Sequence, residues 1–403
     1  MQTMQPVLLG ADLNAYNVAR AFHEAYGVVS QAFGRYPIGV TQHVKILRFE
    51  TVPELDNDAV MTETLNRYAN AHPDGTLILM GCTDDYVSLI IRNRASLSDR
   101  YIIPYISYDL LDEITRKDRF YTYCEKYGIP YPRTVVCEPG QTPEIPFDYP
   151  VIIKPSCSVS YWKHPFDGMK KVYTADNPQE AQNIIARIFD AGYPDPLIIQ
   201  DRIPGDDSHM YTLTAYADEE HRVRMMCLGH VLLEEHTPKG LGNHAAILTE
   251  CNRPLMEKLK AFLEDIQYTG FANFDIKYDA RDQSYRVFEV NVRQGRSNYY
   301  VTAAGCNIAR CLTEDRVEHK PFAGCVFCEK EIYWRYIPDA VVYRYTPKEL
   351  CKKIKALKKA GQAYSSMRYA PDLRRNPRRR LFVALHEYRH RKKFKMYYHP
   401  ERQ

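Results

Sequence analysis

The chain has 403 residues, enough for two or three domains with well-buried cores. Hydrophobic residues make up 45% and charged residues 26%, which excludes a largely disordered chain. The 54 basic and 50 acidic residues leave a net charge of +4, too small to indicate a nucleic-acid-binding protein as a whole.

No apolar run approaches the roughly 20 residues of a membrane-spanning helix. The first residues also lack the basic segment and apolar run of a signal peptide. We therefore expect a cytoplasmic location, with the inner face of the membrane as an alternative. In such a compartment the 11 cysteines are expected to be free thiols. One close pair, Cys325 and Cys328, has no second pair to complete a zinc site.

The first third of the chain alternates predicted strands and helices. A short strand at 7–9 ends at a glycine, and Asp12 is expected to cap a helix that stops at Gly27. A second strand at 77–80 also ends at a glycine, and polar residues follow at 83–85. This repeated order predicts a parallel sheet flanked by helices, with ligands at the carboxyl ends of the strands.

A proline-rich stretch at 138–149 indicates a junction, because it carries three prolines and few apolar side chains, and a fourth proline follows at 150. A strand follows at 151–155, then a helix over 178–192 and a strand at 197–200. A further helix begins at Pro254.

The segment 271–293 has a hairpin pattern, in which two alternating runs flank a polar turn at 279–284. A turn centred near residue 282 places Asp275 opposite Glu289. Strand alternation then puts five polar side chains on one face: Asn273, Asp275, Lys277, Glu289 and Asn291. The other face carries Phe274, Ile276, Phe288 and Val290, which we expect to contribute to the core.

Two carboxylates paired across strands repel each other and need compensation. Mg²⁺ suits such oxygen ligands and leaves positions for phosphate and water. Lys277 offers the alternative of a solvated ion-pair face without metal. The following arginines, Arg293 and Arg296, favour the first interpretation because they can hold anionic groups.

This hairpin resembles the last core strands of ATP-grasp ligases, which carry an Asp on one strand and Glu-x-Asn on the next. Here the match is Asp275 and then Glu289-Val290-Asn291. Further segments resemble the family in the same order along the chain: 116–118, 127–132, 151–155 and 200–206. Four segments, 8–14, 223–230, 268–275 and 293–297, more closely resemble the D-aspartate ligases of peptidoglycan assembly.

The resemblance implies an α/β fold, α+β in the ATP-binding half: an ATP-grasp fold with an N-terminal parallel-sheet domain. The implied boundaries are 1–115 for the N-terminal domain, 116–325 for the ATP-grasp domain with a small lid subdomain at about 134–203, and 326–403 for a basic C-terminal region. It also implies an ATP- and Mg²⁺-dependent ligase that activates the side-chain carboxylate of D-aspartate as an acyl phosphate. The acceptor would be the lysine side-chain amine of a UDP-linked or lipid-linked peptidoglycan precursor.

Residue roles follow from the matched motifs. Mg²⁺ would be held by Asp275, Glu289 and Asn291, and the ATP phosphates by Lys117 and Lys154. The adenine and ribose site would be lined by Gln200, Asp201, Arg202 and Ile203. The catalytic residues that hold the donor or the developing acyl phosphate would be Arg293 and Arg296.

Some features leave alternatives open. The loop at 155–162 lacks the glycines that many ATP-grasp enzymes have over the phosphates. Four central histidines match no zinc motif, and any one could serve as a general base: His209, His230, His236 and His244. The donor could be another amino acid, such as glutamate or D-alanine, because one methylene contributes little discrimination.

The C-terminal residues 371–403 hold 11 basic and 3 acidic residues, whereas 1–370 hold 43 and 47. This tail could bind nucleic acid, anionic lipid or a pyrophosphate-bearing wall precursor, or it could be a solvated helical end. A nucleic-acid-binding protein on a degenerate ligase fold is the alternative from another class. We expect no nucleic-acid partner, because the predicted metal ligands are all present, and favour contact with precursor or membrane.

Overall fold

The computed structural model describes residues 3–238 and 240–398, and the chain divides into two compact units. The first unit contains the described residues as far as Tyr108, then Asp206–Phe274 and those from Asn291 onward. The second contains Asp109–Gly205 and Asp275–Val290. The domain boundaries predicted after residues 115 and 325 stay predictions.

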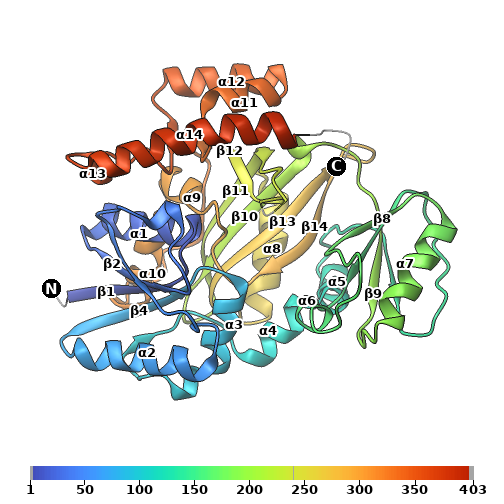
Figure 1. Cartoon of the computed structure of the whole chain (residues 1–403), viewed down its shortest axis with the longest axis horizontal. Helices are drawn as coiled ribbons and strands as arrows, with labels where there is room; N and C mark the ends of the chain where they lie inside the picture. Colours follow the sequence, from blue (N-terminus) through green and yellow to red (C-terminus); the bar gives the residue numbers. More distant parts are fainter. Residues whose placement is uncertain (1–2, 239, 399–403) are drawn as a thin grey trace. The chain divides into compact units, whose positions relative to one another are not determined.

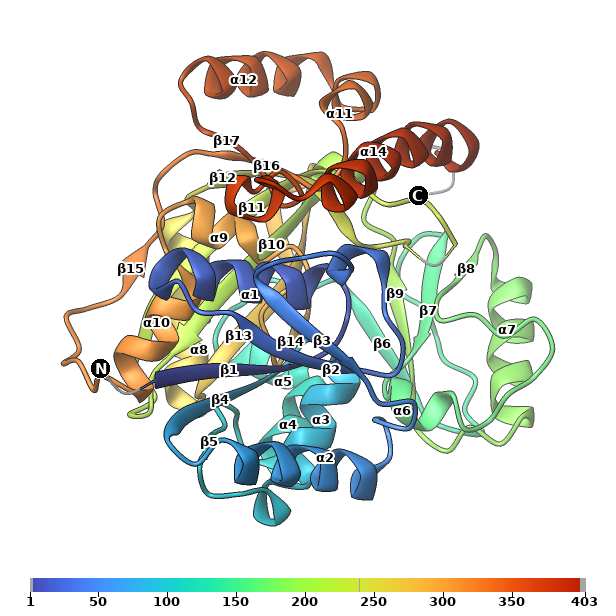
Figure 2. The same cartoon turned by 60° about the vertical axis from the view of Figure 1, so that its left-hand side comes forward.

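A five-stranded parallel sheet opens the first unit, in the order β3-β2-β1-β4-β5. Helix α1 lies on one face of this sheet and α2 on the other (Figures 1 and 2). The predicted parallel sheet flanked by helices is thus confirmed. The elements are β1 (Thr3–Leu9), α1 (Leu13–Tyr26), β2 (Ser30–Gly34), β3 (Leu47–Thr51), α2 (Asp58–Ala71), β4 (Gly75–Gly81), α3 (Asp84–Arg92) and β5 (Tyr101–Ile102).

The turn between β1 and α1 forms for the reasons that the sequence suggests. The side chain of Asp12 accepts hydrogen bonds from the backbone N–H groups of Asn14 and Ala15, which caps the helix. Gly27 ends it in the left-handed conformation, with φ of 69°. Gly10 has φ of 140°, and a Cβ there would lie 2.8 Å from that of Cys82, so the turn requires glycine.

A second, largely antiparallel sheet has the strand order β14-β13-β10-β11-β12-β16-β17, and β15 pairs with β11. The predicted hairpin is present as β13 and β14, and the helix predicted from Pro254 is α8. The elements are β10 (Met210–Ala217), β11 (Val223–Glu234), β12 (His244–Glu250), α8 (Arg253–Asp265), β13 (Gly270–Asp279), β14 (Ser284–Asn291), β15 (Val326–Phe327), β16 (Tyr333–Arg335) and β17 (Ala363–Ser365).

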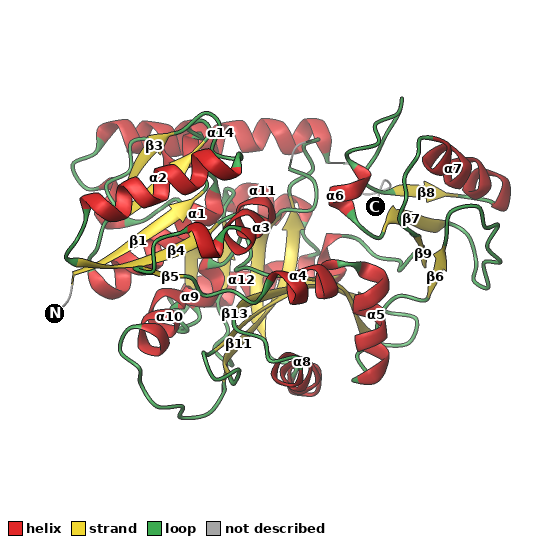
Figure 3. Cartoon of the chain, turned by 90° about the horizontal axis from the view of Figure 1, so that it is seen from below, coloured by secondary structure: helices red, strands yellow, loops and turns green. Residues whose placement is uncertain are grey.

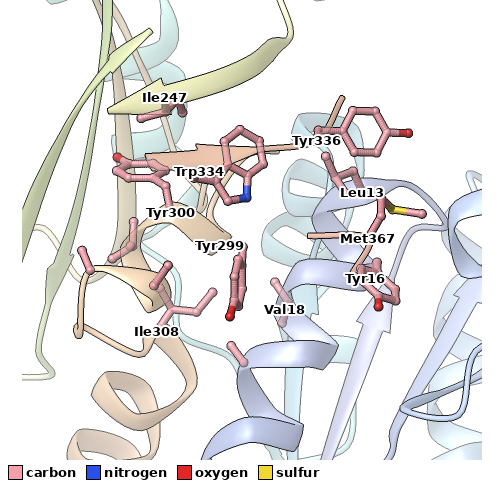
Figure 4. Close-up of a cluster of buried hydrophobic side chains, with 14 of the residues drawn as sticks. Leu13, Tyr16, Val18, Ile247, Tyr299, Tyr300, Ile308, Trp334, Tyr336 and Met367 are labelled. Carbon is pink, nitrogen blue, oxygen red and sulfur yellow. The ribbon is translucent and has the colours of Figure 1, made fainter. Parts of the chain in front are cut away.

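The core of the first unit joins α1 to strands of the second sheet and to two short helices, α9 (Tyr299–Ala303) and α10 (Ile308–Arg316) (Figure 4). Trp334 is its largest fully buried side chain, and its indole N–H donates to the hydroxyl of Ser366 at 2.9 Å. Buried Arg20 lies over the ring of Tyr299, 3.7 Å from the centroid. The core therefore ties the parallel sheet to the antiparallel one within this unit.

The second unit is built on a four-stranded antiparallel sheet in the order β6-β9-β7-β8. Helix α7 packs against this sheet through Ala181, Ile184, Ile185 and Ile188 (Figure 3). The predicted strands at 151–155 and 197–200 and the helix at 178–192 are confirmed. The elements are α4 (Tyr108–Thr115), α5 (Lys117–Lys126), β6 (Thr134–Cys137), β7 (Val151–Pro155), α6 (Ser158–Tyr161), β8 (Tyr173–Ala175), α7 (Pro178–Asp190) and β9 (Leu197–Asp201).

The basic C-terminal region forms helices, namely α11 (Asp339–Tyr345), α12 (Lys348–Lys359), α13 (Ala370–Leu373) and α14 (Pro377–Tyr397). One face of α14 is buried at Arg379, Val383, His386, His390 and Phe394. The interpretation of the tail as a merely solvated helical end is therefore wrong for its described part. Among the described residues, none of the helices combines the length and the apolarity needed to cross a bilayer.

The cysteines depart from expectation at one place. Cys306 and Cys328 are joined by a disulfide, so the expectation that all thiols are free is wrong for this pair. The other nine cysteines are free, and four of them are buried: Cys82, Cys124, Cys137 and Cys227.

Candidate functional site

A lysine–carboxylate cluster lies in the second unit and consists of Lys117, Lys154, Lys171, Asp275 and Glu289. Lys117 is the first residue of α5, and its Nζ lies 3.0 Å from Oε2 of Glu289 on β14. The backbone N–H of Lys117 donates to the carbonyl of Ser156, just after β7, which brings Lys154 on that strand near the same carboxylate.

The charges in this cluster shift each other's protonation. The charge of Lys117, followed by those of Lys154 and Lys171, holds the pKa of Glu289 well below its usual value, although burial opposes this. Burial, together with the positive charge of Lys117, lowers the pKa of Lys154 to about 7, while the charge of Glu289 opposes the shift. Three lysines face two carboxylates here, and a bound polyanion such as the phosphates of ATP would favour the charged form of Lys154, so the cluster suits such a ligand.

The proposed metal ligands lie on the hairpin as the alternation predicts. Glu289 and Asn291 are two residues apart on β14 and therefore share a face. Asn291 Nδ2 donates to the carbonyl of Asn273 on β13 at 3.3 Å. Consecutive strands joined by a short turn run antiparallel, so counting two residues from that contact places Asp275 beside Glu289.

Two carboxylates and one amide oxygen fit Mg²⁺, which usually takes few protein ligands and completes its shell with phosphate and water. Among the described residues there is no group of three or more His, Cys, Asp and Glu side chains that could hold a metal on its own. Lys277, which the sequence offered as the counter-ion, donates to the carbonyl of Gly205 at 2.9 Å. The pairing of Lys117 with Glu289 was not foreseen, because the two lie far apart in sequence.

The segment predicted to line the adenine and ribose site follows β9. Gln200 is buried, and its Nε2 donates to the hydroxyls of Tyr121 and Thr134 at 2.9 and 2.8 Å. Asp201 is also buried and accepts hydrogen bonds from Arg133 and Arg281. Both side chains are therefore held within the second unit, which leaves backbone groups as the means of contacting an adenine ring.

The next two residues of that segment differ in exposure. Arg202 is half-buried and Ile203 is buried. Neither sequence reasoning nor the resemblance indicated that Arg133 and Arg281 neutralise Asp201.

An arginine cluster lies in the first unit and consists of Arg293, Arg296, Asp84, Glu235 and Asp12. Arg293 pairs with Asp84: its Nη2 donates to Oδ2 at 2.9 Å, and its Nε lies 2.8 Å from Oδ1. Arg296 Nη1 lies 3.0 Å from Oε1 of Glu235, and its Nε lies 3.7 Å from Oδ2 of Asp12. The two predicted catalytic arginines thus meet the carboxyl-end turns after β1 and β4, where the parallel sheet predicts ligands.

The loop that carries these arginines is fixed by buried amides. Asn14 Nδ2 donates to the carbonyls of Cys82 and Gln294, and Gln294 Nε2 donates back to Asn14 Oδ1. Asn298 Nδ2 also donates to Asn14 Oδ1, at 2.8 Å. Asn17 Nδ2 donates to the carbonyl of Arg296 at 3.1 Å. Sequence reasoning missed these amides, and their only local signal was two asparagines in the first turns of α1.

The pairs of the two arginines differ in exposure. Asp84 has a side chain that is 62% exposed, whereas that of Glu235 is 8% exposed. An exposed pair contributes little stability and exchanges readily, whereas a buried pair is costly to break. The pair of Arg293 is therefore the less costly one to break on the carboxylate side, although the arginine side chains themselves are similarly buried, at 16% exposed for Arg293 and 24% for Arg296.

The C-terminal helix α14 also contacts the arginine cluster, through Glu235. Nε2 of His390 on α14 lies 3.9 Å from Oε2 of Glu235. Burial acts to raise the pKa of Glu235, but the nearby His390 and the charge of Arg296 outweigh it and hold the pKa at about 2. Helix α14 is thus a structural part of the arginine cluster, a role that its basic composition did not suggest.

One of the four central histidines, His244, is influenced by both arginines. Burial lowers its pKa to about 4, and the charges of Arg296 and Arg293 act in the same direction, so it is neutral at pH 7. Each of the four also lies beside a carboxylate: His209 with Asp206, His230 with Glu250, His236 with Asp207 and His244 with Glu234, the last at 3.8 Å.

Sequence comparison finds one close relative and no family model. The chain is 40% identical over 408 aligned positions to a D-aspartate ligase of Enterococcus faecium (strain Aus0004), covering 98% of this chain and 96% of that protein. No protein-family model matches the sequence.

Solved structures with the same fold are much more distant in sequence. An L-amino acid ligase from Bacillus licheniformis has a TM-score of 0.54 at 11% identity, covering 78% of this chain and 74% of that one. A second is the biotin carboxylase domain of a 2-oxoglutarate carboxylase from Hydrogenobacter thermophilus, in complex with MgADP, ADP and bicarbonate. Its TM-score is 0.58 at 12% identity, covering 81% of this chain and 72% of that one. An N5-carboxyaminoimidazole ribonucleotide synthetase in complex with ADP has a TM-score of 0.57 at 10% identity, covering 83% of this chain and 81% of that one. The expected ATP-grasp fold is confirmed.

Proposed function

Because the chain belongs to the D-aspartate ligase family, we propose that it joins the side-chain carboxylate of D-aspartate to the lysine side-chain amine of a peptidoglycan precursor, with ATP and Mg²⁺. The product would be the cross-bridge residue of the cell wall, made on a UDP-linked or lipid-linked precursor in the cytoplasm. The observation that carries the proposal is the lysine–carboxylate cluster, which places three lysines beside a pair of oxygen ligands.

The chemistry requires activation, because a carboxylate has no good leaving group. In the first step a donor carboxylate oxygen attacks the γ-phosphorus of ATP, and ADP leaves with the bonding electron pair. In the second step the lysine nitrogen attacks the acyl carbon and phosphate leaves, while the amine gives up a proton. The protein contributes mainly by positioning the reactants and stabilising charge.

The residues divide between these tasks. Lys117 and Lys154 would hold the phosphates, and Asp275, Glu289 and Asn291 would hold Mg²⁺, which neutralises phosphate charge when bound. Gln200, Asp201, Arg202 and Ile203 would form the nucleotide-binding segment, through backbone groups for the first two.

Donor recognition falls to the arginine cluster. Arg293 would turn from Asp84 to the donor or the acyl phosphate, because that carboxylate is exposed and the planar fork of the arginine matches both groups. Arg296 would add positive charge from a fixed position, held by Glu235.

The donor is tested by acceptor-dependent release of ADP with D-aspartate, L-aspartate, D-glutamate and D-alanine in parallel. The proposal expects release with D-aspartate at least tenfold faster than with any of the others. A faster reaction with D-glutamate or D-alanine would assign the chain a different donor. Acceptor-independent release with all four would remove the ligase proposal.

A further inference from the structure

The long helix α14 has apolar side chains on two opposite sides. One side is the buried stripe from Arg379 to Phe394 that packs within the first unit. The other side carries exposed apolar residues that recur at helical spacing, namely Leu381, Leu385, Tyr388 and Met396, which are 62%, 42%, 53% and 64% exposed. We call these four residues the outer stripe. A helix needs only one apolar face to pack on its own protein, so the outer stripe points to a second environment.

Basic residues border the outer stripe along both of its edges. At 100° per residue, Arg378 and Arg389 lie on one edge and Arg380 and Arg391 on the other. Lys392 and Lys395 lie within the same outward half of the helix, and both are exposed. The outward face therefore combines apolar side chains with a band of positive charge.

Acidic residues do not neutralise this face. Glu387 is the only acidic residue of α14, and its carboxylate accepts two hydrogen bonds from Arg368, both at 2.7 Å. The buried cation of the helix, Arg379, is paired with Asp372 at 3.0 Å and contributes no outward charge. The exposed positive charge of the helix is thus uncompensated within it.

We propose that the outer face of α14 is a docking surface for an anionic lipid bilayer. A helix of 21 residues is roughly 30 Å long and can lie along a membrane surface with Leu, Tyr and Met side chains inserted between the headgroups. The flanking arginines and lysines then meet the negative headgroups. Nucleic acid is bound mainly through positive charges, so a nucleic-acid partner would leave the apolar outer stripe without a role.

The inference goes beyond the proposed ligase activity and does not depend on it. Membrane docking also gives a role to the contacts that fix the inner side of α14 to the rest of the first unit. His390 on its inner side contacts Glu235, and Arg379 donates to the carbonyl of Val40 at 2.7 Å, so the outer stripe is presented by a fixed element. Docking in this way would bring the arginine cluster close to a lipid-linked acceptor.

The test is co-sedimentation of the full chain with vesicles of phosphatidylglycerol and phosphatidylcholine, compared with vesicles of phosphatidylcholine alone. We expect binding to the anionic vesicles to be at least tenfold tighter. The variant Leu381→Ser/Leu385→Ser/Met396→Ser keeps every charge and should lose at least tenfold of that binding. The control variant Tyr36→Ser/Val326→Ser removes two other exposed apolar side chains and should bind as the wild type does.

A second pair of variants separates the helix from net charge. Lys392→Gln/Lys395→Gln on α14 should weaken vesicle binding, whereas Lys348→Gln/Lys352→Gln on α12 should not, although both remove two exposed lysines. Equal losses from both would overturn the proposal, as would an outer-stripe variant that binds normally.

Nucleic acid and activity complete the test. Binding of a single-stranded or duplex oligonucleotide that exceeds vesicle binding and depends on the same α14 lysines would assign the surface to nucleic acid instead. Acceptor-dependent ADP release with a soluble precursor should be unchanged in all four variants, which also shows that they are folded. If the wild type lacks that activity, circular dichroism replaces it as the folding control, and the vesicle result still decides this proposal alone.

Discussion

Lys117 and Glu289 form an ion pair of 3.0 Å, between the first turn of α5 and the third-from-last residue of β14. The resemblance to ATP-grasp ligases implies that Lys117 binds the ATP phosphates and that Glu289 binds Mg²⁺. In the structure each partner neutralises the other. Binding of MgATP would therefore exchange this pair for a lysine–phosphate and a carboxylate–metal contact, so that neither group is left unpaired.

Glu289→Gln should lower ligase activity by about 10- to 100-fold and raise the Mg²⁺ concentration needed for half-maximal rate. The amide keeps the shape of the side chain but not its charge, so both the metal and Lys117 lose a partner. The measurement is the initial rate of ADP release against Mg²⁺ concentration. Asp282→Asn, on the exposed turn of the same hairpin, is the matched control and should behave as the wild type does. A normal Mg²⁺ response in Glu289→Gln would refute the ligand role.

Lys154 makes stability depend on pH. Its pKa is about 7 in the folded chain and near 10.5 when unfolded, so between these values the unfolded state binds more protons and stability rises with pH. Lys154→Met removes the cost of the buried ammonium and should be more stable than the wild type below pH 7. That advantage should shrink by up to about 1.4 kcal/mol per pH unit between pH 7 and 10. Urea denaturation of both proteins at pH 6.5 and pH 9 measures this stability advantage. A stability difference that does not change with pH would contradict the lowered pKa of Lys154.

Arg293→Ala should abolish turnover, with a loss of at least about 100-fold in kcat/KM for the donor, and should leave the fold intact. Its partner Asp84 is 62% exposed, but the Arg293 side chain is only 16% exposed, so the free energy of unfolding should fall by about 1 to 2 kcal/mol. Arg92→Ala removes an exposed pair, with Asp58, and serves as the control. Unchanged donor kinetics in Arg293→Ala would show that this arginine does not meet the donor.

Glu235→Gln tests the fixed half of the arginine cluster. Because the pKa of Glu235 is lowered from 4.5 to about 2, its stabilising effect is complete above pH 4.5 and is lost as the pH falls toward 2. The free energy of unfolding of the variant should be roughly 3 kcal/mol lower than that of the wild type at pH 7. This difference in stability should become smaller as the pH falls below 4.5. Chemical denaturation at pH 7 and pH 3.5 checks both points. Glu331→Gln, at an exposed pair, should cost less than about 1 kcal/mol.

Much of the fold follows from local sequence signals. The glycine turns, the cap at Asp12 and the stop at Gly27 predicted α1 and its sheet, because backbone conformation and capping are decided within a few residues. The hairpin could be predicted for the same reason, since strand alternation places Glu289 and Asn291 on one face. The motif order along the chain then indicated the ATP-grasp fold, which the solved structures confirm.

The partners of the site residues could not be predicted, because they are distant in sequence. Nothing local links Glu235 to Arg296 or His390, or Asp84 to Arg293. The C-terminal tail shows the same limit. Its positive charge was evident from the sequence, but the buried stripe of α14 depends on the helices and loops that pack against it. Burial and pairing of this kind are properties of tertiary contacts rather than of a sequence window.

The most direct test of the central claim is mass analysis of a UDP-linked lysine pentapeptide after incubation with the protein, D-aspartate and MgATP. The account predicts that the precursor gains the mass of one aspartyl residue, that fragmentation places it on the lysine side chain, and that the gain requires both ATP and Mg²⁺. A precursor of unchanged mass, in the presence of folded protein and all three substrates, would contradict it.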